Sequence, residues 1–255
     1  METHGYSQEE WKVRCDLAAL YRVIAHFRWT DMIFTHISAR VPGADHHFLI
    51  NRYGVLFDEM RASDLVRIDS EGRPVEAGAS DDPGRYRVNP AGFTIHSAVH
   101  MARPDVLCVV HTHTAAGAAV SAQKQGLLPI SQHALKYYGH IAYHDYEGIA
   151  LDLAERDRLV NDLGPQNAMI LKNHGLLTCG KSIPEAFQEM YFLERACEIQ
   201  IRALAGNAEL NLPSQRVCEL TAEQYRRDES DGIMALQWEA ALRMIEGSGK
   251  TDYRS

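Results

Sequence analysis

Two histidines stand one residue apart in the stretch VVHTHTAAGAAV, where an apolar run gives way to small residues. If that run is a strand, His111 and His113 project from the same face, because side chains alternate along a strand. Both imidazoles could then bind one metal cation. The same pattern also suits an ordinary polar face, so this pair alone leaves metal binding open.

A third histidine, His174, precedes a glycine in the stretch MILKNHGLL. A glycine after a strand lets the backbone turn sharply, and functional side chains are common at such strand ends. Three histidines with an open fourth position are the ligand set of a catalytic zinc site, and imidazole also suits iron, manganese or cobalt. The alternative for His174 is a turn residue that caps a backbone carbonyl, and spacing does not decide between the two.

The elements that must position these histidines follow from hydrophobic periodicity and capping patterns. Ser7 with Glu10 and Ser182 with Glu185 are capping boxes, and each predicts the start of a long helix. Apolar spacing predicts two more helices, over 93–103 and 150–163, and it predicts strands over 46–54, 106–114 and 167–175 with a loop over 80–92. The alternation indicates one α/β domain whose sheet is covered on both faces, and by itself it favours a parallel sheet.

Composition excludes several classes of function. The chain has 255 residues, of which 45% are hydrophobic, and this is enough for one large domain. Its formal net charge of −8 and its lack of a lysine or arginine cluster argue against nucleic acid and anionic membranes as partners. No apolar segment is long enough to span a membrane, and the N-terminus does not resemble a signal peptide, so we expect a soluble, cytoplasmic protein.

The remaining motifs point away from disulfides and nucleotides. Five widely spaced cysteines without a CxxC pair predict reduced thiols. No glycine-rich signature of a dinucleotide site or a P-loop is present, so we expect no nucleotide cofactor.

Three longer segments carry a resemblance to a known family. They are FTIHSAVHMARPDVLCVVHTHTAAGAAVSAQKQGLLPIS, IAYHDYEGIALD and NAMILKNHGLLTCGKSIPEAFQEMYFLERACEIQIRAL. They resemble the class II aldolase/adducin family, and most closely the adducin head and its bacterial relatives. The resemblance implies an α/β fold of three α/β/α layers around a mainly antiparallel sheet. It assigns residues 1–210 to this domain and residues 211–255 to a helical tail that packs on the core or on a neighbouring subunit.

The resemblance also implies a metal centre, but a residue near it differs from the pattern of the family. The metal ligands of the family match His111, His113 and His174, so we expect one divalent ion, zinc first, with iron or manganese as alternatives. Sugar-phosphate aldolases and epimerases of the family carry an acid/base Glu or Asp nineteen residues before the first of these histidines. Here that position is Gly92, although His96 keeps the histidine four residues further on.

The phosphate-binding positions of the family are altered as well. Its serine pair corresponds to Pro90 and Ala91, and its early Gly-Asn corresponds to Thr35 and His36. Proline has no N–H and alanine has no hydroxyl, so we expect an unphosphorylated substrate.

We predict that His36, Asn89 and Gly92 line the substrate site. Arg85 and Arg87 are either partners for a substrate carboxylate or solvated surface residues.

Without the carboxylate, proton transfer needs another group. The stretch QHALKYYGHIAYHDYEG lies near the site in related enzymes, partly across a subunit boundary. We assign proton transfer to His133, Tyr138 and His140, because tyrosine and histidine can serve as acid and base near neutral pH. Other candidates in the same stretch are Tyr137, Tyr143, His144 and Asp145.

These observations predict a metal-dependent lyase that performs retro-aldol cleavage or decarboxylation on a small unphosphorylated hydroxy- or keto-acid, with aromatic acids among the candidates. Its partners are a small-molecule substrate and copies of itself, as a homotetramer, with no nucleic acid and no membrane. One alternative is a non-haem iron oxygenase on the same scaffold. The other is a non-catalytic, adducin-like oligomerisation module, against which the intact histidines weigh.

Overall fold

A single mixed sheet runs through the molecule. The computed structural model describes residues 3–44, 46–76, 82–149, 154–228, 232–247, 249 and 251–255. Within these ranges the sheet has the strand order β3-β2-β1-β4-β7-β6-β5. The strands are β1 (His36–Arg40), β2 (Phe48–Asn51), β3 (Leu65–Ile68), β4 (Cys108–Thr112), β5 (Ala142–His144), β6 (Ala168–Leu171) and β7 (Gly175–Gly180). Neighbours are antiparallel except β5 with β6. The mainly antiparallel sheet that the resemblance implies is therefore confirmed, and the expectation of a parallel sheet is wrong.

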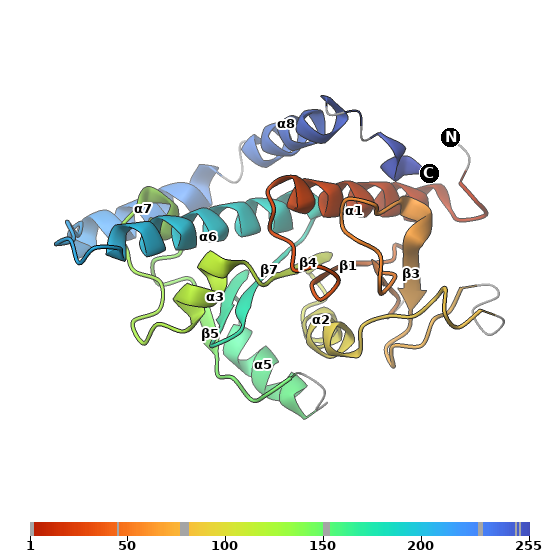
Figure 1. Cartoon of the computed structure of the whole chain (residues 1–255), viewed down its shortest axis with the longest axis horizontal. Coiled ribbons are helices and arrows are strands. Elements are labelled where there is room, and N and C mark those ends of the chain that lie inside the picture. Colours follow the sequence, from red (N-terminus) through yellow and green to blue (C-terminus); the bar gives the residue numbers. More distant parts are fainter. Residues whose placement is uncertain are drawn as a thin grey trace.

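Helices cover both faces of this sheet and form the outer layers of an α/β/α arrangement. They are α1 (Gln8–His26), α2 (Pro90–Ala102), α3 (Ala115–Ser121), α4 (Gln132–Leu135), α5 (Glu155–Leu163), α6 (Ile183–Leu204), α7 (Gln215–Asp228) and α8 (Ile233–Gly247), with short 3-10 turns η1 (Ala62–Asp64) and η2 (Asp252–Arg254). Figure 1 shows α1 and α6 on one face and α2 and α5 on the other. The three-layer fold is therefore confirmed. None of the described helices is both long and apolar enough to cross a membrane.

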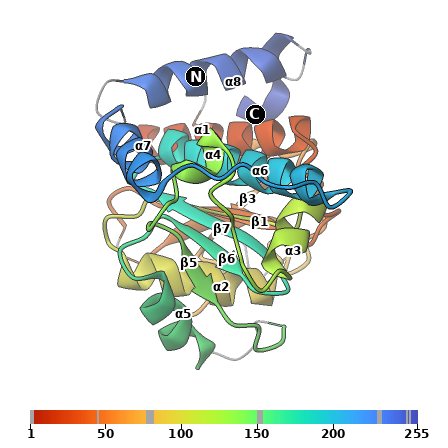
Figure 2. The same cartoon turned by 90° about the vertical axis from the view of Figure 1, so that its left-hand side faces the viewer.

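The tail beyond α6 returns to the same chain. In both views α8 lies on the outer side of α1 and α6, and it contacts both helices (Figures 1 and 2). Trp238 and Ile245 of α8 are buried there. The tail therefore packs on the core of its own subunit through α8.

The two larger of three apolar clusters among the described residues hold the layers together. One lies between the sheet and helices α1 and α6, and the other between the sheet and helices α2 and α5. Successive residues of β4 belong to alternate clusters, with Val109 facing α2 and Val110 facing α6. Burying such side chains stabilises the fold by roughly 1.5–3 kcal/mol each. The same alternation sends the side chain of His111 to the α2 face and that of Thr112 to the α6 face.

The two helix starts that the capping boxes predict agree with the structure. Ser7 Oγ accepts a hydrogen bond from the Glu10 N–H at 3.1 Å, and Ser182 Oγ accepts one from the Glu185 N–H at 3.2 Å. Helix α2 begins earlier than predicted, at Pro90, since the fixed φ of proline suits the first turn of a helix.

Other predicted segments differ from the structure in extent or lie partly outside the described residues. The strand expected over 167–175 is divided, because β6 ends at Leu171 and a turn leads into β7 at Gly175. Helix α5 is described from Glu155, and residues 150–153 of the predicted helix lie outside the described residues. Residues 80 and 81 of the predicted loop also lie outside them.

Candidate metal centre

Three imidazole nitrogens converge where β4 ends and β7 begins. Nε2 of His113 lies 2.7 Å from Nε2 of His111 and 2.9 Å from Nε2 of His174. All three nitrogens lie within 4.8 Å of one another. The antiparallel pairing of β4 with β7 causes this, because it places Thr112 opposite Leu176 and so brings the first two histidines beside the third.

The outer nitrogens of two of these rings show which atoms carry hydrogen. Nδ1 of His111 lies 2.8 Å from the carbonyl oxygen of Leu176, and Nδ1 of His113 lies 3.1 Å from Oδ2 of Asp31. A carbonyl and a carboxylate only accept, so both Nδ1 atoms donate, and both Nε2 atoms keep lone pairs. Two lone pairs 2.7 Å apart repel each other unless a cation lies between them. The donor set therefore fits a divalent metal ion, whose histidine ligands usually donate their second N–H in this way.

Burial keeps two of these ligands, His111 and His174, in the form that binds metal. It lowers the pKa of His111 well below its usual value, and the neighbouring imidazoles lower it further. Burial also lowers the pKa of His174 to about 4, with His113 as the next cause. Both rings are consequently neutral at pH 7, and a neutral imidazole is the metal-binding form.

The turn that carries His174 depends on the two residues that flank this histidine in the sequence, Asn173 and Gly175. Asn173 has a left-handed φ of 55°, which asparagine tolerates better than most residues. A Cβ on Gly175 would lie 2.3 Å from the carbonyl oxygen of Thr112, so only glycine allows the two backbones to approach. The His174 N–H is held at 3.1 Å by Ser121 Oγ.

On the opposite face of β4, one buried carboxyl holds the strand end. Glu194 of α6 accepts hydrogen bonds from the hydroxyls of Thr112 at 2.6 Å and Thr114 at 2.7 Å. These threonines flank His113 on either side, and Thr114 also caps α3 by accepting from the Gly117 N–H at 2.9 Å. Burial raises the pKa of Glu194 to about 7. No sequence pattern marked this residue.

A cavity of about 460 Å³ opens beside the three histidines, and we call it the triad cavity. Its lining includes His36 and Asn89, both predicted substrate contacts. Asn89 Oδ1 also caps α2 by accepting from the Ala91 N–H at 3.1 Å. Gly92 supports the site from behind, because its missing side chain leaves room for the ring of His36.

Sequence reasoning missed the other polar and aromatic residues of this cavity. They are Asp31, Phe34, Tyr53, Tyr146 and Asn173. Each lies in a connection between elements. Tyr146 and Asn173 stand in segments that carry the family resemblance, but no pattern marked their side chains, and only the fold brings the five residues together.

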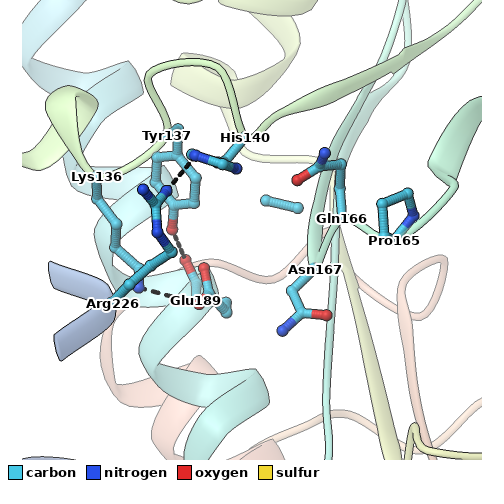
Figure 3. Close-up of a pocket in the computed structure, with 9 residues that line it drawn as sticks. Lys136, Tyr137, His140, Pro165, Gln166, Asn167, Glu189 and Arg226 are labelled. Carbon is cyan, nitrogen blue, oxygen red and sulfur yellow. Dashed lines mark hydrogen bonds and ion pairs between the residues drawn. The ribbon is translucent and has the colours of Figure 1, made fainter. Parts of the chain in front are cut away.

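The predicted proton-transfer residues lie elsewhere in this chain. His133, Tyr138 and His140 are absent from the described lining of the triad cavity. The ring of His133 lies 5.5 Å from that of Phe192. His140 lines a separate cavity of about 180 Å³, where it accepts a hydrogen bond from Arg226 (Figure 3). Their catalytic role stays a prediction that requires a neighbouring subunit.

The other candidates in that stretch have local partners. The Tyr137 hydroxyl donates to the Glu189 carbonyl oxygen at 2.6 Å, as Figure 3 shows. The Tyr143 hydroxyl accepts from the Leu127 N–H at 3.0 Å. His144 contacts Asp162 and Glu155, and Asp145 pairs with Lys172. Arg85 and Arg87 lie near the rings of Tyr86 and Tyr53 and are not among the described lining residues of the triad cavity.

A mainly antiparallel sheet between helical layers, with three histidines converging at one strand end, defines a class II aldolase-type domain. Residues 15–201 match the family described as Class II Aldolase and Adducin N-terminal domain, and the chain belongs to this family.

Three relatives place the chain within that family. An aldolase II superfamily protein from Pseudomonas syringae is 54% identical, with a TM-score of 0.92 over 99% of this chain and 98% of that one. An L-fuculose 1-phosphate aldolase from Glaciozyma antarctica is 29% identical, with a TM-score of 0.83 over 97% of this chain and 93% of that one. Alpha-adducin from Rattus norvegicus is 42% identical over 98% of this chain but only 35% of its own length.

Proposed function

We propose that this protein is a metal-dependent lyase that cleaves a carbon–carbon bond of a small unphosphorylated hydroxy- or keto-acid, by retro-aldol cleavage or decarboxylation. Family membership and the similarity to an L-fuculose 1-phosphate aldolase support the aldolase-type lyase class. The observation that carries the proposal is the convergence of three Nε2 atoms at the edge of the triad cavity.

We propose the following roles for the residues of this site. His111, His113 and His174 would hold the ion, for which we propose zinc, and a bound divalent ion polarises a substrate carbonyl. Asp31 and the Leu176 carbonyl hold two of these rings in the required tautomer. His36 and Asn89 face the same cavity and would orient the substrate.

The lining supports an unphosphorylated substrate. Lysine and arginine, which usually bind phosphate, are absent from its described residues. The start of α2 offers little instead, because Pro90 has no N–H and the Ala91 N–H is taken by Asn89. Phe34, Tyr53 and Tyr146 contribute three aromatic rings to the lining, which favours a substrate with an aromatic or apolar substituent.

The test begins with metal content. Protein purified without a histidine tag should carry one divalent ion per subunit, and His111→Ala should lose it, because two neutral ligands compete poorly with chelators. His26→Ala, at an exposed helix end, should keep it. The metal-loaded protein is then assayed for carbonyl products or CO₂ from a panel of hydroxy- and keto-acids. Unchanged metal content in His111→Ala would contradict the site.

Sugar phosphates are the compounds on which we expect no activity in this test. We expect no useful turnover of fuculose, rhamnulose or ribulose phosphates, because of the altered residues Pro90, Ala91 and Gly92. Turnover above about 1 s⁻¹, the low end of ordinary enzymes, would show that other groups replace them.

Two other functions make different predictions. A non-haem iron oxygenase would carry iron as purified and consume O₂ with substrate, and the missing carboxylate at position 92 would matter less to it. A non-catalytic oligomerisation module is suggested by the similarity to alpha-adducin. Such a module has no need of the hydrogen bonds that orient His111 and His113, so the ordered triad favours an enzyme.

We also propose a homotetramer in which a neighbouring subunit completes each site. His133, Tyr138 and His140 do not reach the triad cavity in one chain, and exposed apolar side chains on α7 and α8 offer contact surface, among them Val217, Leu220 and Leu236. Light scattering over a dilution series should show activity and assembly falling together. A fully active monomer would place the whole site within one chain.

A further inference from the structure

Helix α3 contacts both parts of the chain that carry the metal ligands. It begins two residues after His113, with Thr114 as its N-cap, and it ends at Ser121, whose side chain is buried. The helix also packs on β6 and β7, and His174 lies in the turn between these two strands. One short helix is therefore in a position to influence the whole triad.

The start of α3 is bound to the strand end that carries His113. Thr114 follows this histidine directly, and its hydroxyl donates a hydrogen bond to Glu194 at 2.7 Å. The same oxygen accepts a hydrogen bond from the Gly117 N–H at 2.9 Å, which caps the helix. A displacement of the first turn of α3 would therefore move the backbone beside His113.

The end of α3 holds the turn that carries His174. The Ser121 hydroxyl donates to the Ala118 carbonyl oxygen at 2.7 Å, and it accepts a hydrogen bond from the His174 N–H at 3.1 Å. The carbonyl oxygen of Ser121 accepts another from the Asn173 N–H at 3.1 Å. Two successive amides of this turn are therefore bound to one residue at the end of α3.

The middle of α3 lies against the residue that orients His111. A Cβ on Gly117 would lie 2.8 Å from Cγ and 2.9 Å from Cδ1 of Leu176, so a larger side chain would push the helix away from β7. The carbonyl oxygen of Leu176 lies 2.8 Å from Nδ1 of His111 and accepts its hydrogen. In this way α3 contacts a residue that supports each of the three ligands.

We propose that α3 fixes the positions of the three ligand nitrogens and that Ser121 is the positioning residue for His174. This inference rests on the metal site of the proposed function. The stability of α3 and the binding of the ion are then linked. A helix held in place keeps the triad ready for the ion, and a bound ion holds the helix in place, because such a coupling acts equally in both directions.

Amide hydrogen exchange measures this link in the unmodified, full-length protein. The zinc affinity is first determined by competition with a chelating dye. With zinc at about ten times its dissociation constant, amides of residues 117–122 should exchange about tenfold more slowly than in the metal-free protein, because opening of α3 would release the ion. Amides of α8 that exchange by local opening should not change. Equal exchange of residues 117–122 with and without zinc would overturn the proposal.

A pair of serine variants tests the role of Ser121. Ser121→Ala removes the acceptor of the His174 N–H, whereas Ser97→Ala removes an equally buried helical hydroxyl that donates to the Phe93 carbonyl in α2. We expect Ser121→Ala to bind zinc about tenfold more weakly and Ser97→Ala to match the unmodified protein. The visible absorption of bound cobalt depends on how its ligands are arranged, so it should change in Ser121→Ala alone. A merely structural role would lower the urea midpoint and leave this spectrum unchanged.

Each result has a separate meaning. Equal zinc affinity and equal cobalt spectra in the two serine variants would overturn the role of Ser121. Weaker zinc binding confined to Ser121→Ala, in a protein without lyase activity, would keep this role and reject the proposed reaction. An unmodified protein that binds no zinc would contradict both the metal site and this inference. If Ser121→Ala does not fold, hydrogen exchange of the unmodified protein decides.

Discussion

The ring of His36 fills the space into which a side chain at position 92 would project. A Cβ on Gly92 would lie 2.5 Å from Cδ2 and 2.8 Å from Cγ of His36. The two residues come from β1 and α2, so the packing of α2 on the sheet couples them. By resemblance, position 92 holds the acid/base carboxylate in sugar-phosphate enzymes of the family. In this protein an imidazole takes that space.

Gly92→Ala should therefore lower the free energy of unfolding by about 1–3 kcal/mol, the usual cost of overpacking. In an open helix the same change would instead stabilise by up to about 1 kcal/mol. Adding His36→Ala should remove most of the cost, because the clash disappears. Urea unfolding of the two single variants and the double variant measures the coupling, with Gly247→Ala as a control at an open position. Additive effects of the two changes on the free energy of unfolding would contradict the coupling between Gly92 and His36.

Glu194→Leu should weaken zinc binding by about 10–100-fold, the usual effect of removing a group that supports a metal site. The hydroxyls of Thr112 and Thr114 would lose their acceptor, and the strand end that carries His113 would loosen. Glu194→Gln should lose less, because its amide oxygen still accepts one hydroxyl. Competition with a chelating dye measures the affinity, and Glu198→Gln, one turn further along α6, is the control. Equal affinity in Glu194→Leu and the control would show that the hydrogen bonds of Glu194 to Thr112 and Thr114 have no influence on the metal.

Asp31→Ala should weaken zinc binding over a similar range, because His113 would no longer be held in the Nδ1–H tautomer. Asp31→Asn should behave more like the unmodified protein, since its amide oxygen can still accept this hydrogen. The same dye competition applies. An Asn variant as weak as the Ala variant would indicate that the carboxylate charge, and not the hydrogen bond, matters.

Acid should destabilise the metal-free protein between about pH 6.5 and pH 4. Burial lowers the pKa of His100 to about 3 and of His174 to about 4 in the folded state. The unfolded chain therefore binds protons first as the pH falls below 6.5, and each such histidine costs up to about 1.4 kcal/mol per pH unit. His36, His96 and His111 are shifted in the same direction.

Glu194 has the opposite effect on stability as the pH falls. Burial raises its pKa to about 7, so folding favours its protonated form. Glu194→Gln should therefore make the loss of stability from pH 7 to pH 5 steeper. Urea midpoints at the two pH values measure both effects. A chain as stable at pH 5 as at pH 7 would contradict the burial of these neutral histidines.

Local patterns were sufficient for the parts of the molecule that depend on neighbouring residues. The capping residues Ser7 and Ser182 mark helix starts because their partners are three positions away. His111 and His113 could be paired because a strand repeats every two residues, and His174 stood out because a glycine follows it. The family resemblance added the direction of the strands, which periodicity alone had suggested wrongly.

Tertiary structure decided everything that depends on contacts between distant parts of the chain. Asp31 reaches His113, and Glu194 reaches Thr112, across 82 positions each, and neither stands in a motif. The ring of His36 leaves no room for a Cβ at Gly92, and no residue pattern encodes this fit. The stretch from 133 to 140 looked chemically suitable, yet the path of the chain places it away from the triad cavity. Residue types limit the chemistry that is available, but packing across the sheet decides which of those residues meet.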